Sequence, residues 1–160
     1  MKTNILIVFF TVIFSSMLLI ACNDDDGDTT PPVIDLIAPG EGAAFEIGDE
    51  HGVHLDMELS DNEMLQSYQV EIHSNFNGHQ HSTTAKSEEG TKAFFFKNSW
   101  DISGKKNVKI HHHEIIIPAN ATPGNYHLMV YCTDVAGNES YVARNIVLSS
   151  EEQAHEHSYQ

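Results

Sequence analysis

The residues best able to do chemistry in this 160-residue chain are its eleven histidines, most of which fall into short clusters. Imidazole is the commonest protein ligand for zinc, copper and nickel. The pattern His-x-His occurs at 79–81 and at 111–113, and on a strand it places both rings on one face, roughly 6.5–7 Å apart along the chain. Rings on neighbouring strands can then converge on one ion. We therefore expect a zinc or copper site formed by His73, His79, His81, His111 and His113, with His54 and Asp56 as additional candidate ligands.

The same histidines have a plainer interpretation as solvated residues on outward strand faces. We prefer that interpretation for His51, His112, His127, His155 and His157. A chain rich in both histidine and acidic residues could also be a low-affinity metal buffer or a pH-responsive surface, because imidazole titrates near neutrality.

Other arrangements give no sign of catalysis, and we expect that the protein is not an enzyme. The sequence has no Gly-x-Ser-x-Gly motif, no glycine-rich phosphate loop and no His-Glu-x-x-His helix. Two acidic segments, 61–63 and 134–139, could bind calcium through oxygen atoms. We prefer the interpretation that both are ordinary turns, in which Asp and Asn bond their own backbone.

The elements that must position these residues are short strands separated by turns. Apolar and polar residues alternate or form compact runs at 33–37, 53–59, 68–73, 93–97, 107–117, 126–133 and 141–148. Residues 60–63 read as a turn, and Asn77-Gly78 is a signal for a tight hairpin. In the strand 107–117 the apolar phase changes from even positions (Val108, Ile110) to odd positions (Ile115, Ile117), which predicts a bulge within 111–113.

The C-terminal part of the chain resembles the end of a bacterial immunoglobulin-like domain. The resemblance rests on Pro-Gly-Asn-Tyr-His-Leu-Met-Val at 123–130 and Thr-Asp-Val-Ala-Gly-Asn at 133–138. It implies that Tyr126 forms a corner before its strand, that Leu128, Val130 and Cys132 face the core with it, and that 134–138 is a turn between strands. Together with the strand pattern it predicts an all-β, immunoglobulin-like Greek-key sandwich of about seven strands over residues 33–149.

A narrower resemblance covers the segment Ile-His-Ser-Asn-Phe-Asn-Gly-His-Gln-His at 72–81. This segment is similar to the Ile-His-x-Asn-Phe-x-x-His-x-His pattern of an uncharacterised family of Bacteroidetes lipoproteins. The family implies no activity, so the expected chemistry rests on the residues themselves.

The N-terminus has the layout of an export signal. One lysine precedes an apolar run from 5 to 20, and Leu-Ile-Ala-Cys at 19–22 resembles a bacterial lipobox. The resemblance implies a signal peptide over 1–21 and acylation of Cys22, which would anchor the protein in the membrane. We expect a flexible acidic tether over 22–32 and a disordered polar tail over 150–160. The acidic run after Cys22 resembles a Bacteroidetes surface-export signal, which implies an outer-membrane protein exposed on the cell surface; a periplasmic spacer is the alternative.

The charge of the chain restricts its partners. Eight basic and 23 acidic residues give a formal net charge of −15, which argues against nucleic acid. The leading functional hypothesis is a surface-anchored module that captures zinc or copper. The alternative is an adhesion or accessory module that binds a protein or a glycan, with the histidines incidental.

Overall fold

The computed structural model describes residues 27–76 and 90–150, and the regular elements within them are all β-strands. His79, His81 and the predicted hairpin at Asn77-Gly78 lie outside the described residues, as do the predicted signal peptide, Cys22 and residues 151–160. No helix in the described segments is long and apolar enough to cross a membrane. The strands are β1 (Val33–Ala38), β2 (Ala43–Glu46), β3 (Val53–Ser74), β4 (Phe96–Ile115), β5 (Gly124–Asp134) and β6 (Glu139–Ser149).

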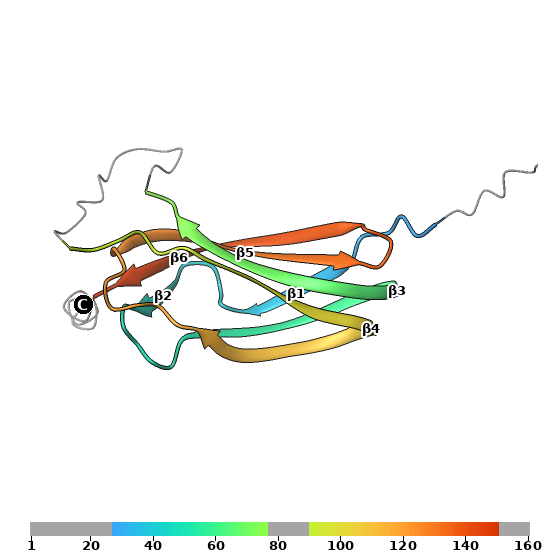
Figure 1. Ribbon diagram of the computed structural model, residues 1–160, viewed down its shortest axis with the longest axis horizontal. Helices are drawn as coiled ribbons and strands as arrows, with labels where there is room; N and C mark the ends of the chain where they lie inside the picture. Colours follow the sequence, from blue (N-terminus) through green and yellow to red (C-terminus); the bar gives the residue numbers. More distant parts are fainter. Residues whose placement is uncertain (1–26, 77–89, 151–160) are drawn as a thin grey trace, which may run out of the picture.

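The long strands β3 and β4 run antiparallel to each other and contribute to both layers of the fold (Figure 1). The first part of β3 pairs with β1 on one side and with the last part of β4 on the other. The later part of β3, from Leu65 onward, pairs with β5 and with the first part of β4. Strand β5 also pairs with β6 in antiparallel orientation, and β2 pairs with the other edge of β6 in parallel orientation. The sheet therefore curls into two layers, which confirms an all-β, sandwich-like fold.

The number of strands differs from the prediction because, in two cases, a pair of predicted strands forms one continuous strand in the structure. Residues 53–59 and 68–73 belong to the single strand β3, and the segment 60–63 that reads as a turn lies inside it. The chain does not reverse there; the pairing with β4 shifts register between Ser60 and Leu65 instead. Residues 96–97 and 107–115 likewise belong to β4, whereas the short strand β2 was not predicted.

The core lies between the layers and is formed by the alternate residues that the sequence pattern points inward. Val53, Leu55, Met57 and Leu59 of β3 are all buried. The inward face of β5 is completely buried, as the immunoglobulin resemblance implies. It consists of Tyr126, Leu128, Val130 and Cys132. Burial of apolar surface is the main stabilising term in such a domain.

Tyr126 forms the predicted corner at the start of β5. Its hydroxyl donates a 2.7 Å hydrogen bond to the carbonyl of Thr122, four residues earlier, and accepts one of 3.2 Å from the backbone N–H of Phe94. The ring is fully buried, so both bonds form away from water. A tyrosine that bonds back to the upstream backbone is typical of immunoglobulin-like sandwiches.

The predicted bulge in β4 is present at 113–114, at the end of the predicted interval. Leu55 pairs with His112, but Val53 pairs with Ile115, so His113 and Glu114 together lie opposite His54. Val108 and Ile110 are half-buried on one side of this bulge, and Ile115 is fully buried on the other. The extra residue thus reconciles the two apolar phases of the strand.

Candidate metal centre

Three histidines come together on the outer face of the layer that contains β1. His111 and His113 are two residues apart in β4, so their side chains leave the same face of the strand. His54 is the second residue of β3 and lies opposite the bulge. The sequence places all three outward because Leu55, next to His54, is buried, and because Ile110 and His112, which alternate with His111 and His113, are partly buried on the other face.

The three rings are close enough to share an ion. One nitrogen from each of His54, His111 and His113 lies within 4.8 Å of the other two. The rings of His54 and His113 are stacked with centroids 4.8 Å apart, and the His111 ring meets them edge-on at 4.9 and 5.8 Å. Tetrahedral zinc with bonds of about 2.0–2.1 Å needs nitrogens roughly 3.3–3.5 Å apart. Small side-chain rotations would bring these exposed rings to that separation.

The environment of the three rings leaves their nitrogens available. All three side chains are exposed, and none of them forms a hydrogen bond or an ion pair with another residue in the described part of the chain. Asp56 pairs with His111 across β3 and β4 and is half-buried, but it is not among the three ligands that lie within 4.8 Å. Three protein ligands leave a fourth position open for water or another ligand.

His112 lies on the opposite face of β4 and is not the solvated residue that the sequence suggested. Its ring packs against Trp100 at 5.1 Å, and its Nε2 is 3.2 Å from the hydroxyl of Tyr68. Tyr68 and Trp100 are stacked on each other in the other layer, so this contact joins the two layers. Burial lowers the pKa of His112, partly offset by the nearby charge of Glu114. Burial, reinforced by the same carboxylate, raises the pKa of Tyr68 to about 12.

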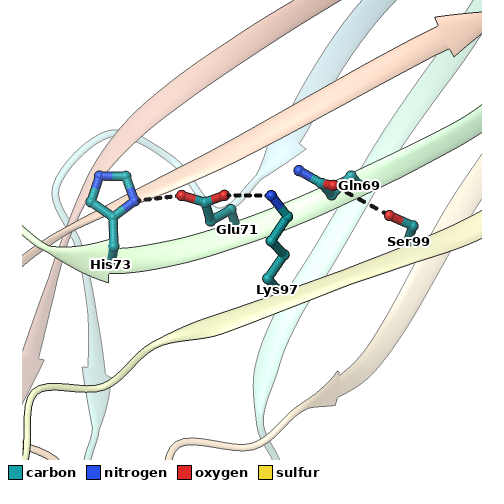
Figure 2. Close-up of polar contacts among 5 residues, drawn as sticks. All are labelled: Gln69, Glu71, His73, Lys97 and Ser99. Carbon is teal, nitrogen blue, oxygen red and sulfur yellow. Dashed lines mark hydrogen bonds and ion pairs between the residues drawn. The ribbon is translucent and has the colours of Figure 1, made fainter.

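His73 lies near the last residue of β3, whereas His54 lies near the first, so the structure does not bring His73 to the three-histidine group. Figure 2 shows His73 within a row of polar contacts instead. Its Nδ1 is 3.1 Å from an oxygen of Glu71, whose other oxygen forms a 3.3 Å ion pair with Lys97. The His73 ring also meets His127 edge-on at 5.5 Å. His127 is half-buried rather than fully solvated, and its Nε2 lies 2.7 Å from the side-chain amide of Asn75.

The candidate centre therefore contains two residues of the expected ligand set, His111 and His113, and one of the additional candidates, His54. His51 is exposed, as expected, and its Nδ1 contacts Asp49 at 2.7 Å. The spacing of His111 and His113 identified their common face, but His54 joins them through strand pairing. That pairing depends on the register between β3 and β4, which no local pattern specifies.

Comparison with curated proteins found no match to this chain. A family profile described as "Domain of unknown function (DUF4625)" matches residues 20–149, which include all six strands. The match extends over more than three quarters of the sequence and agrees with the resemblance to an uncharacterised family. The chain therefore belongs to the DUF4625 family.

Proposed function

We propose that this protein is a non-catalytic binding module that captures a zinc or copper ion through His54, His111 and His113. The observation that carries the proposal is the convergence of three ring nitrogens within 4.8 Å, from two strands, on an exposed face. The proposal includes export, acylation of Cys22 and exposure at the outer-membrane surface. Metabolic labelling with palmitate, compared between the wild type and Cys22→Ala, tests the anchor.

The chemistry of the site suits ion capture. Neutral imidazole binds zinc and copper, and three such ligands form a stable site with one open position. Exposure of the rings allows an ion to enter directly from solvent, with adjustment of the side chains alone. The net charge of −15 also favours the approach of cations over anions. Because a metal must compete with protons for the rings, binding should weaken at acid pH.

His79 and His81 remain part of the proposal as further ligands from the segment 77–89. Their contribution is separable from that of the three-histidine group, because the two sets can be substituted independently.

The test is calorimetric titration of the full-length chain, in a mild detergent because residues 5–20 are apolar, with zinc chloride and with copper chloride. We expect one ion per chain at about pH 7.5 and a much weaker heat at about pH 5.5. The variants His54→Gln and His113→Gln should each weaken binding at least roughly tenfold, since ligand loss exceeds the 10–100-fold effect of supporting residues.

The matched control is His51→Gln, which changes an exposed histidine three positions before His54 that lies outside the group. It should bind as the wild type does. Unchanged affinity in both ligand variants would refute the proposed centre, and so would loss of binding only in the double variant His79→Ala, His81→Ala. A chain that binds neither metal would favour the adhesion alternative.

A further inference from the structure

Three aspartates from separate parts of the chain lie close together, away from the three-histidine group. Asp28 precedes β1, Asp61 lies within β3 where its register shifts, and Asp134 is the last residue of β5. One carboxylate oxygen from each lies within 4.8 Å of the other two. Figure 1 shows the segment before β1 and the turn between β5 and β6 at the same end of the molecule.

Each aspartate is held in place by hydrogen bonds to one or both of its oxygens. Asp61 Oδ1 accepts bonds from two backbone N–H groups of its own bend, at 2.8 and 2.9 Å. Asp134 accepts bonds of 2.8 Å from the backbone and the side-chain amide of Asn138. Asp28 Oδ1 accepts a 3.0 Å bond from Asn62, and Asn138 donates a 2.9 Å bond to the Asp28 carbonyl. These bonds fix the three carboxylates relative to one another.

The decisive feature is that two carboxylate oxygens of this group take part in none of these hydrogen bonds. Asp28 Oδ2 and Asp61 Oδ2 are shielded from solvent, and neither has a hydrogen-bond partner among the described residues. Asp134 is completely buried. None of the four ion pairs found in the described segments involves any of the three. A buried carboxylate oxygen without a partner is costly, and a buried group of like charges is more so.

The electrostatic environment agrees with a concentration of negative charge at this place. Burial raises the pKa of the Cys132 thiol to about 12, and the nearby charges of Asp61 and Asp134 add to the increase. The pKa of Asp28 is lowered, first by the hydrogen bond from Asn62 and then by the backbone bond from Thr30, which keeps this carboxylate ionised.

We propose that Asp28, Asp61 and Asp134 bind a calcium ion. Calcium takes oxygen ligands at about 2.3–2.6 Å, so oxygens on opposite sides of the ion are roughly 4.6–5.2 Å apart. The three carboxylate oxygens all lie within 4.8 Å of one another, so they are close enough to contact one such ion. Magnesium demands near-ideal octahedral geometry and usually keeps several waters, and zinc favours nitrogen and sulfur ligands. Waters or further oxygens would complete the coordination.

The calcium ion would tie the segment before β1 to the bend in β3 and to the end of β5. It is separate from the three-histidine centre, because Asp61 follows His54 by seven residues of extended strand, which is roughly 23 Å. Calcium binding would therefore fix the direction in which the N-terminal segment leaves the sandwich, independently of transition-metal capture.

The test uses the full-length chain in detergent, stripped with a calcium chelator and then titrated with calcium chloride alone. At a hundredfold excess over the dissociation constant, we expect the unfolding midpoint to rise by roughly 5–10 °C. Magnesium chloride at the same concentration should produce a smaller rise. The absence of a calcium-dependent shift and of a calorimetric signal in the wild type would overturn the proposal.

Asp61→Asn is the diagnostic variant, because an asparagine oxygen can still accept the two backbone bonds while the negative charge is lost. It should weaken calcium binding at least roughly tenfold. If this variant does not fold, Asp28→Asn, which lies outside every strand, provides the same comparison.

The matched control is Asp101→Asn, since Asp101 also accepts a backbone bond, from Ser103 at 2.8 Å, but is exposed and outside the group. It should keep the full calcium response, and equal losses in Asp61→Asn and Asp101→Asn would overturn the assignment. His54→Gln should also keep the response, which distinguishes failure of this site from failure of the histidine centre.

Discussion

Gly52 connects the stability of the fold to the geometry of the histidine centre. It directly precedes β3 and has a φ of +73°, a conformation that side chains other than glycine disfavour. A Cβ atom at this position would lie 2.5 Å from the carbonyl oxygen of His113 and 2.9 Å from that of Ile115. These two carbonyls flank the bulge that carries His113, so Gly52→Ala should push on the bulge itself.

The expected loss of stability has two parts. Placing alanine in the left-handed region costs about 1–2 kcal/mol. Forcing a methyl group against two backbone carbonyls costs about 1–3 kcal/mol more, as overpacking does in a core. The sum is about 2–5 kcal/mol, which corresponds to a decrease of roughly 8–20 °C in the unfolding midpoint at about 4 °C per kcal/mol. Thermal unfolding followed by circular dichroism measures it.

Gly42→Ala separates the two parts. Gly42 has nearly the same φ, +75°, but nothing lies within 4 Å of its Cβ position. This variant should lose only the backbone part, about 1–2 kcal/mol, and should bind zinc as the wild type does. Gly52→Ala should bind zinc at least roughly tenfold more weakly, equivalent to about 1.4 kcal/mol. Equal midpoints for the two variants, or unchanged zinc affinity in Gly52→Ala, would refute the argument that this glycine positions the bulge.

Two further predictions concern buried polar groups. Tyr126→Phe should lower the free energy of unfolding by about 1–3 kcal/mol, because a backbone carbonyl and a backbone N–H lose their partner; the exposed control Tyr141→Phe should change it little, and equal effects in urea denaturation would contradict the corner's role. Because the pKa of His112 is lowered below its usual 6.5 by burial, the unfolded state binds its proton more readily, and stability should fall as pH drops through about 6.5 and level off below the folded pKa. His112→Gln should flatten this decrease, and an unchanged dependence of the midpoint on pH would show that His112 does not contribute to it.

The local sequence pattern was sufficient where one face of a strand is buried. The alternation from Val53 to Leu59 predicted which residues enter the core, and all four predicted inward side chains are buried. The phase change around His112 likewise predicted a bulge that the structure contains. Such predictions succeed because side chains alternate strictly along a strand, and an extra residue is the simplest way to change phase.

The same reasoning was wrong about 60–63 because a turn and a bend inside a strand use the same residues. Asp61 accepts hydrogen bonds from backbone groups two and three residues later, as aspartate does in a turn. Whether the chain then reverses or continues depends on what pairs with it. Here β4 accompanies β3 on both sides of the shift, so the strand continues.

Pairing across strands also decided which histidines meet. The spacing of His111 and His113 fixes their face, but their third partner could have been any histidine on a neighbouring strand. Antiparallel pairing brings the beginning of β3 beside the end of β4, which selects His54 and leaves His73 near the opposite end of β3. Register is set by the whole set of buried contacts, and no segment of the sequence contains that information alone.

Both proposed ion sites coincide with places where β3 changes register. His54 lies opposite the bulge at 113–114, and Asp61 lies within the shift between Ser60 and Leu65. In a regular ladder, side chains stand apart at fixed intervals, whereas a register shift tilts the strand and turns neighbouring side chains toward one another. Ligand groups from different segments can then approach within bonding distance of one ion. The irregular positions of β3 are therefore those at which the fold is best able to bring ligand groups from different segments together around a cation.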